Sequence, residues 1–236
     1  MNIIVTGASK GIGCEIVKQF AVGVDNNIVA LARDIEQLKK LKSYCKTQHN
    51  NDIHIYSIDF LSDSFRDDFN SIMSTHNYHF DIIINNAGTL INKSFKETNK
   101  QIIAETFQIN VFAPVYIIQS ILKKNTDENK LCHIVNIGSM GGYQGSVKFP
   151  GLSIYSSSKA AIANLTECIA EEYKDTNVKI NCLALGSVQT EMLNKAFPGY
   201  QAQLTPSDIA KYIVGFSKNG TKFFNGKIIP ISKSTP

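Results

Sequence analysis

Short apolar segments alternate with longer amphipathic segments along the whole chain. The apolar segments predict β-strands over residues 2–6, 27–32, 53–58, 80–85, 131–137, 178–184 and 227–231. Between them, apolar residues recur at the spacing of one helix face, which predicts helices over residues 11–23, 34–48, 62–77, 97–124, 154–174 and 206–218. Strands and helices that alternate in this way are typical of an α/β fold.

The composition of the strands indicates the kind of sheet. Residues 81–85 read Asp-Ile-Ile-Ile-Asn, and such nearly unbroken apolar strands are buried on both faces in parallel sheets covered by helices. We therefore predict a single Rossmann-type, doubly wound parallel sheet of about seven strands, with right-handed crossovers and helices on both faces. No repeat, proline-rich linker or change of composition divides the chain, so we expect residues 1–236 to form one domain.

Composition and charge exclude several classes of protein. The 236 residues are 43% hydrophobic and 19% charged, which is ordinary for a globular protein and excludes a disordered chain. The chain has no apolar run of about 18 residues and begins without a secretory signal pattern, so we expect a cytoplasmic protein without a membrane partner. The net charge of +4 comes from scattered lysines, typical of a solvated surface, and we expect no nucleic-acid partner.

Neither the cysteines nor the histidines are spaced like metal ligands. The cysteines include no Cys-x-x-Cys pair and lie in apolar or helical segments, which favours buried, reduced thiols over disulfides or zinc. We therefore expect no metal site. The residues concerned are Cys14, Cys45, Cys132, Cys168, Cys182, His49, His54, His76, His79 and His133.

A glycine-rich turn follows the first predicted strand. It reads Gly7-Ala-Ser9-Lys10-Gly11-Ile12-Gly13, with the spacing Gly-x-x-x-Gly-x-Gly. Glycines permit a tight turn and let backbone N–H groups approach a pyrophosphate at a helix N-terminus. A plain helix cap is the alternative, but the position directly after the first strand favours a dinucleotide site.

The end of the second predicted strand bears on the choice of dinucleotide. An acidic residue there would hold the ribose 2′-hydroxyl of NAD, but the chain has Ala32 followed by Arg33, and Lys10 lies in the glycine loop. Two cations favour a 2′-phosphate through charge-assisted hydrogen bonds. The alternative is that both are ordinary surface cations. We predict that NADP(H) is favoured over NAD(H).

The next two strand ends carry residues with two interpretations each. Asp59, followed by Phe60, either accepts a hydrogen bond from an adenine amino group or caps a helix. Asn86, Ala87 and Gly88 follow the fourth strand, where small residues suit a backbone that a ligand approaches closely. Asparagine at this place can also tie neighbouring loops together.

A group with acid–base potential follows the fifth predicted strand. Tyr155 and Lys159 are four residues apart, so they share one face of a helix, and Ser139 ends the preceding strand. An ammonium beside a phenol favours the phenolate, so we expect the pKa of Tyr155 to fall by about 1–3 pH units from its usual value of about 10. This would make Tyr155 a general acid–base, with Ser139 holding a substrate oxygen beside it.

Together these motifs resemble the short-chain dehydrogenase/reductase family over nearly the whole chain. The resemblance implies that Tyr155 passes a proton to the substrate oxygen, that Lys159 binds the nicotinamide ribose, that Ser139 positions substrate and that Asn110 holds a water of a proton relay. The residues that it places on the cofactor are Gly7, Ser9, Lys10, Gly11, Ile12, Gly13, Arg33, Asp59, Phe60, Asn86, Ala87, Gly88, Tyr155, Lys159, Gly186, Val188 and Thr190.

The chain departs from the family's pattern in three places. Leu185-Gly186 replaces a common Pro-Gly, the segment between Ser139 and Tyr155 is a few residues longer, and the tail 225–236 lacks the common Asp-Gly-Gly ending. These differences concern substrate shape and assembly more than proton chemistry.

The expected function is NADPH-dependent reduction of a small-molecule carbonyl to an alcohol, or the reverse reaction. A dinucleotide-sensing regulatory protein on the same fold is the alternative. Residues 189–205 are expected to form a substrate lid, in which apolar residues such as Phe197 and Tyr200 line the pocket or serve packing alone. A 3-oxoacyl thioester, a small ketone, a sugar and a pterin all fit as substrates. The resemblance implies a homodimer or homotetramer built on the faces of helices 97–124 and 154–174, and the residues themselves do not decide between the two.

Overall fold

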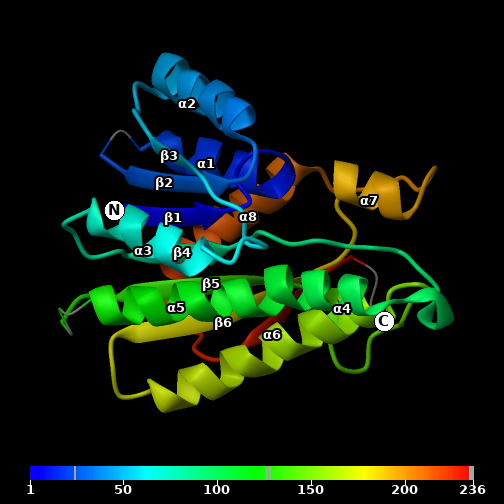
Figure 1. Ribbon diagram of the computed structural model, residues 1–236. Coiled ribbons are helices and arrows are strands. Elements are labelled where there is room, and N and C mark those ends of the chain that lie inside the picture. Colours follow the sequence, from blue (N-terminus) through cyan, green and yellow to red (C-terminus); the bar gives the residue numbers. More distant parts are fainter. Residues whose placement is uncertain (24, 126, 128, 234–236) are drawn as a thin grey trace.

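A computed structural model describes residues 1–23, 25–125, 127 and 129–233. Within this part, seven parallel strands form one sheet in the order β3-β2-β1-β4-β5-β6-β7, so the chain is wound outward in both directions from β1 and β4 (Figure 1). This confirms the predicted doubly wound parallel sheet. The strands are β1 (Asn2–Thr6), β2 (Asn27–Ala32), β3 (His54–Ser57), β4 (Ile82–Asn85), β5 (Cys132–Ser139), β6 (Val178–Leu185) and β7 (Ile228–Ile231).

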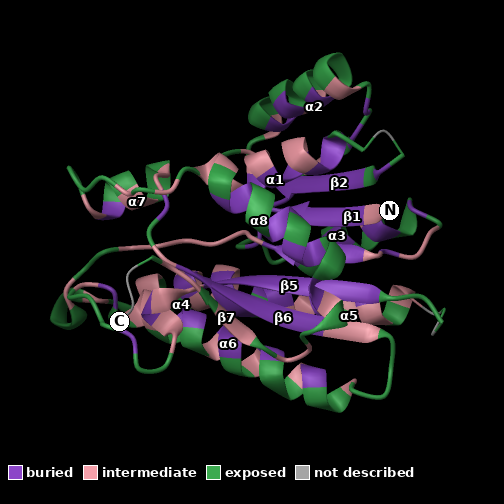
Figure 2. Ribbon diagram, turned by 180° about the vertical axis from the view of Figure 1, so that it is seen from behind, coloured by how far each residue is buried: buried purple, intermediate pink, exposed green. Residues whose placement is uncertain are grey.

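Helices cover both faces of the sheet, as expected. One apolar layer packs α1, α2 and α8 on one face, and a second packs α3, α5 and α6 on the other. Figure 2 shows the buried strands between helices whose outer sides are exposed. The helices are α1 (Gly11–Ala21), α2 (Ile35–His49), α3 (Phe65–Ser74), α4 (Lys100–Phe107), α5 (Ala113–Lys124), α6 (Ser153–Glu172), α7 (Glu191–Ala196) and α8 (Pro206–Asn219).

The apolar strands are buried because their side chains alternate between the two layers. In β1, Ile3 and Val5 pack with Ile16 and Phe20 of α1, whereas Ile4 packs in the opposite layer. Each of these side chains is fully buried. Burial of one such side chain contributes about 1.5–3 kcal/mol, so the hydrophobic effect holds the sheet between its helices and fixes which strand ends meet.

The predicted helix over 97–124 is interrupted in the structure. It consists of α4, a π-helical turn at Gln108–Phe112, and α5, preceded by a short 3₁₀ turn at Phe95–Glu97. Pro114 near the start of α5 lacks the N–H that would bond the carbonyl of Asn110, so a regular α-helical bond is missing here. The stretch Lys100–Lys124 is long and apolar enough to cross a membrane by length and composition alone. Here it packs against the sheet through residues such as Ile117 and Ile121.

The cysteine side chains are buried or partly buried, as expected, with one exception. Cys45, Cys132 and Cys182 are buried and Cys14 is partly buried, and all five thiols are free. Cys168, however, is exposed, because it lies on the side of α6 away from the buried Thr166 and Ala170. No group of potential metal ligands is found among the residues that the structure describes.

Candidate active site

Two loops meet at the carboxyl edge of the sheet, one after β1 and one after β4. The Thr6 hydroxyl oxygen accepts hydrogen bonds from the N–H groups of Asn86 (3.1 Å) and Ala87 (3.0 Å). The Asn86 side chain donates in turn to the carbonyl oxygens of Thr6 (2.9 Å) and Gly7 (3.3 Å). Asn86 therefore ties the two loops together. Thr6, the residue directly before the glycine turn, helps to hold them through its hydroxyl oxygen.

The glycine loop has a backbone that other residues would disturb. Gly7 and Gly11 have φ angles of 68° and 59°, in the left-handed region that favours glycine. A Cβ atom on Gly13 would lie 2.2 Å from the Gly7 carbonyl oxygen. The loop is thus held tightly against the start of α1, with Ser9 in the turn and Ile12 packed against the core.

The N-terminus of α1 has no side-chain cap. Lys10 occupies the N-cap position but makes no side-chain cap hydrogen bond, and the first turn contains no acidic residue. The N–H groups of this turn therefore lack a local side-chain acceptor and carry the positive end of the helix dipole. An anionic pyrophosphate fits this loop, so the residues present agree with a dinucleotide cofactor.

The residues after β3 divide between surface and core. Asp59 is exposed, and one of its carboxylate oxygens accepts a hydrogen bond from the Leu61 N–H (3.0 Å), closing a turn. It does not cap a helix, because the N-cap of α3 is Ser64. The Phe60 ring is buried and stands edge-on to Phe65, with centroids 5.1 Å apart. The Phe60 side chain therefore belongs to the core, which leaves its backbone for any ligand contact.

The two cations expected beside a 2′-phosphate have different surroundings. Arg33 is exposed after β2, and its guanidinium has no ion pair within the described part of the chain. The Lys10 ammonium lies 2.7 Å from a carboxylate oxygen of Glu191, the first residue of α7. Glu191 was not expected at this place, since nothing local in the sequence relates it to a lysine 181 positions away.

Ser139, Tyr155 and Lys159 are brought together where β5 meets α6. The Ser139 and Tyr155 hydroxyl groups are hydrogen-bonded, and the Ser139 oxygen also accepts from the Gly141 N–H (3.2 Å). The Lys159 ammonium lies 6.0 Å from the centre of the Tyr155 ring and donates to the Ile137 carbonyl oxygen at 2.8 Å. The three side chains can thus act on one small group bound against β5.

The acid–base properties differ from the expectation. Burial raises the pKa of Tyr155, and the Ser139 hydrogen bond offsets this only in part, so the expected lowering by Lys159 is wrong for this structure. Burial also lowers the pKa of Lys159 from 10.5 to about 8. The reason is that solvent exclusion opposes both charged forms, while the ammonium is directed at Ile137 instead of the phenol oxygen.

Asn110 lies in the π-helical turn and holds the loop after β4. Its side-chain oxygen accepts from the Thr89 N–H (2.8 Å), and its amide nitrogen donates to the Thr89 carbonyl (3.0 Å) and the Ser158 hydroxyl (2.9 Å). A Cβ atom on Gly88 would lie 3.4 Å from the Asn110 side-chain oxygen and 3.5 Å from the Lys159 nitrogen. Asn110 and Lys159 therefore face the same small space beside Gly88.

The segment after β6 crosses back over the glycine loop. The Gly186 N–H donates to the Ile231 carbonyl of β7 (2.9 Å), and the buried Val188 forms a single parallel bridge with Leu204. Thr190 caps α7 by accepting from the Leu193 N–H (3.2 Å). The Thr190 methyl group would lie 3.7 Å from a Cβ atom on Gly11. The base of the expected lid thus borders the expected cofactor loop.

The far side of the same segment meets two other loops. The Asn92 side chain donates to the Ala196 carbonyl (2.7 Å), and the rings of Phe149 and Phe197 contact each other edge-on with centroids 6.3 Å apart. Met192 and Tyr200 remain 40% and 50% exposed. In Figure 1, α7 lies beyond the carboxyl ends of the strands.

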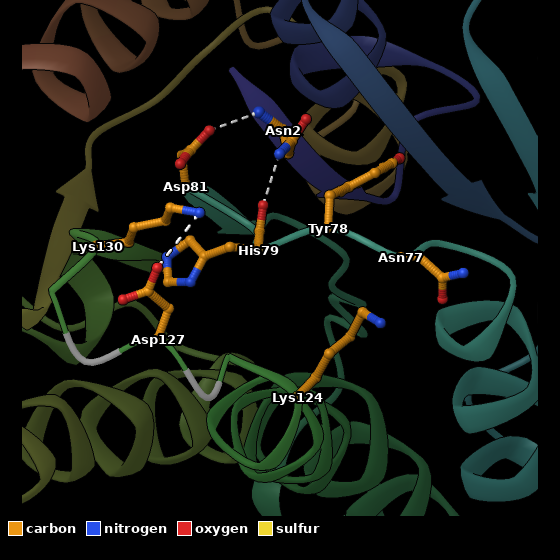
Figure 3. A pocket seen from close by; sticks show the side chains of 8 residues that line it. All are labelled: Asn2, Asn77, Tyr78, His79, Asp81, Lys124, Asp127 and Lys130. Carbon is orange, nitrogen blue, oxygen red and sulfur yellow. Dashed lines mark hydrogen bonds and ion pairs between the residues drawn. The ribbon is translucent and has the colours of Figure 1, made fainter.

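A polar hollow of about 430 Å³ lies at the opposite end of the sheet (Figure 3). Asn2 and Asp81, at the amino ends of β1 and β4, are joined there by a hydrogen bond of 2.7 Å. Ligands of doubly wound sheets bind at the carboxyl ends of the strands, so this hollow is separate from the candidate active site. It is lined by Asn2, Asn77, Tyr78, His79, Asp81, Lys124, Asp127 and Lys130.

Comparison with known families agrees with this arrangement. The family model described as short chain dehydrogenase matches residues 1–201, so the chain belongs to that family. It is accordingly an oxidoreductase that acts on CH–OH or C=O groups, which decides for an enzyme over the dinucleotide sensor.

Individual relatives resemble nearly the whole chain. Farnesol dehydrogenase of Aedes aegypti is 29% identical, over 90% of this chain and 89% of that protein. A short chain dehydrogenase from Shigella flexneri complexed with NADP is 26% identical with a TM-score of 0.86, covering 97% of this chain and 95% of that one. The corresponding structure from Escherichia coli CFT073, complexed with NADPH, is 25% identical with a TM-score of 0.85 over 97% and 95%.

Proposed function

We propose that this protein is an NADPH-dependent oxidoreductase that reduces a carbonyl to an alcohol, or catalyses the reverse, with Tyr155 as the general acid–base. The observation that carries the proposal is the hydrogen-bonded Ser139–Tyr155 pair, with Lys159 one helical turn further on α6. This group stands at the same edge of the sheet as the uncapped start of α1. Substrate and cofactor sites on one edge are what hydride transfer requires.

The preference for NADP rests on charge at the end of β2. No carboxylate ends this strand, and Arg33 and Lys10 would present cations to the adenosine side of the cofactor. The bound nicotinamide would supply or accept the hydride. The glycine loop of residues 7–13 would hold the pyrophosphate with its backbone N–H groups, and Asp59, Ala87, Gly88, Val188 and Thr190 would border the rest of the cofactor.

Proton transfer would use the partly buried hydroxyl groups of Ser139 and Tyr155. Because its pKa is raised, Tyr155 holds its proton at neutral pH and can donate it to an oxygen that becomes negative as hydride arrives. Ser139 would hold the same oxygen, and both hydroxyl groups would stabilise its developing charge. Lys159 has a pKa of about 8, so it is mostly protonated near neutral pH. Lys159 and Asn110 would connect this proton to solvent through the space beside Gly88.

The proposal extends to substrate entry, domain organisation and assembly. Residues 189–205 would form a lid over the substrate. The whole chain, residues 1–236, would form a single domain, of which residues 24, 126, 128 and 234–236 lie outside the described part. The exposed side chains of Met192 and Tyr200 favour an apolar substrate wall over packing alone.

A homodimer or homotetramer would form through the faces of residues 97–124 and 154–174. The protein would work in the cytoplasm, where its free thiols stay reduced.

Oxidation of NADPH in the presence of diketones, acyl thioesters, ketoses and quinones tests the reaction. We expect turnover by the wild type and a loss of about 100-fold or more in kcat for Tyr155→Phe, because the proton donor is removed. NADPH should still bind that variant with nearly unchanged affinity, measured by fluorescence titration. Equal turnover by Tyr155→Phe would overturn the proposed acid–base role, and better use of NADH would overturn the cofactor preference.

A further inference from the structure

The lid helix α7 is joined to the glycine loop by an ion pair. One carboxylate oxygen of Glu191 lies 2.7 Å from the Lys10 ammonium, and the other lies 2.6 Å from the Lys195 ammonium. Lys10 directly precedes α1, and Glu191 is the first residue of α7. The side chains of Lys10 and Glu191 are 65% and 51% exposed, so a ligand can reach both.

This ion pair engages one of the two cations proposed to recognise a 2′-phosphate. A phosphate placed on Lys10 would lie within a few ångströms of the Glu191 carboxylate and would be repelled by it. A ribose 2′-hydroxyl carries no charge and would not compete for the ammonium. Glu191 therefore opposes the binding of a 2′-phosphate and not that of a 2′-hydroxyl, although it belongs to the lid and not to the cofactor loop.

Lys195 lowers the free-energy cost of separating Lys10 from Glu191. If Lys10 turns to a phosphate, the Glu191 carboxylate keeps its contact with Lys195, which lies one helical turn along α7. The two lysines together hold the pKa of Glu191 down to about 2, so the carboxylate is charged throughout the neutral range. The far end of α7 stays attached through the Asn92 bond to Ala196. Only the start of α7 would be released.

We propose that Glu191 is a specificity-determining residue that holds Lys10 in the free protein and yields it to the 2′-phosphate of NADP, which loosens the start of α7 from the glycine loop. NAD, with its 2′-hydroxyl, leaves the ion pair in place. This inference rests on the proposed function, because it assigns Lys10 to a 2′-phosphate.

Calorimetric titration with adenosine 2′,5′-bisphosphate and with 5′-AMP tests the NADP preference and the role of Glu191 separately. In the wild type we expect the bisphosphate to bind more tightly than 5′-AMP. Glu191→Gln should tighten binding of the bisphosphate by about three- to tenfold more than it tightens binding of 5′-AMP, since both ligands carry the 5′-phosphate and only the bisphosphate carries a charge at the 2′ position. Glu171→Gln, which removes a carboxylate from an exposed ion pair on α6, is the matched control and should change neither affinity.

The role of Lys10 is tested in the same titration. In a Lys10→Met background the gain from Glu191→Gln should be much smaller, because the competition for the shared cation is gone and only the direct repulsion between the two anions is left. Hydrogen exchange gives a readout that does not depend on activity. The amides of α7 should exchange faster with the bisphosphate than with 5′-AMP in the wild type.

The possible results distinguish a failure of the role of Glu191 from a failure of the proposed NADP preference. If the wild type binds the bisphosphate no more tightly than 5′-AMP, both the NADP preference and the role of Glu191 are overturned. If the bisphosphate binds more tightly, but Glu191→Gln leaves its affinity unchanged, only the role of Glu191 is overturned. The coupling to α7 is overturned if exchange in α7 is the same with both ligands.

Discussion

The Lys159 ammonium shows how burial acts on a single residue. It is 5% exposed and donates to the Ile137 carbonyl at 2.8 Å. One neutral acceptor offsets only part of the free energy lost when a charge leaves water, so its pKa falls from 10.5 to about 8. The charged form is therefore destabilised in the folded protein relative to the unfolded chain.

This difference predicts a stability that depends on pH. Between pH 8 and pH 10.5 the unfolded chain binds a proton on Lys159 that the folded protein has lost, so the contribution of this group to stability rises with pH. Below pH 8 the full penalty, about 3 kcal/mol, is present. We expect Lys159→Met to raise the free energy of unfolding at neutral pH and to lose this advantage toward pH 10.5.

Urea unfolding at several pH values measures this effect. The exposed Lys211 on α8 is the control, since Lys211→Met should not change the dependence on pH. An advantage of Lys159→Met that grows as pH rises would contradict the sign argued here.

At the scale of elements, α6 is positioned by the short 3₁₀ turn Met140–Gly142 that follows β5. A Cβ atom on Gly142 would lie 2.5 Å from the Ala160 nitrogen and 2.5 Å from the Lys159 carbonyl carbon. Backbone atoms cannot rotate away, so any larger residue must push this part of α6 outward. The turn therefore sets the distance between β5, which carries Ser139, and the helix that carries Tyr155.

Gly142→Ala tests this dependence of the site on element packing. We expect kcat/KM to fall by about 100-fold, because a displacement near 1 Å misplaces Tyr155 relative to Ser139. Steady-state kinetics and thermal unfolding measure the two effects separately. Gly215→Ala on α8 is the control, since nothing lies within 4 Å of its added Cβ, and it should keep full activity and gain about 0.5–1 kcal/mol. Full activity in Gly142→Ala would show that α6 adjusts freely.

At the scale of the whole molecule, cofactor binding shifts the equilibrium between the folded and the unfolded chain. The proposed site joins the loops after β1, β2 and β4 with the segment after β6, which the chain brings together only when the sheet is complete. A ligand of this site binds the folded protein and not the unfolded chain. Its binding free energy therefore adds to global stability.

The proposed cofactor preference predicts different thermal shifts. NADPH at about 100 times its Kd should add about 2.7 kcal/mol, and Tm should rise by about 5–10 °C. NADH at the same concentration should give a smaller rise. In Lys10→Met/Arg33→Met the difference between the two should largely disappear, whereas the exposed control Lys174→Met should retain it. Equal shifts in the wild type would argue against the selection of a 2′-phosphate.

The sequence by itself determined the class of fold. Apolar runs that bury both faces leave a chain of this length few arrangements other than a parallel sheet between helices, and the observed strands fall within a few residues of the predicted ones. Because ligands of such sheets bind at the carboxyl ends of the strands, the sequence also predicted that the glycine turn, Ser139 and the Tyr155–Lys159 pair lie at one edge of the sheet. Residue type and local spacing carry this information, and both are readable along the chain.

Only the tertiary structure decided the properties that depend on neighbours distant in sequence. The pKa of Tyr155 rises because folding excludes water from it, which no spacing reveals. Asn110 lies in a π-helical turn that bonds Thr89 and Ser158 on separate segments. Lys10 meets Glu191 because β1 and β6 end at the same edge of the sheet. Each depends on solvent access or packing between elements, and these exist only once the chain has folded.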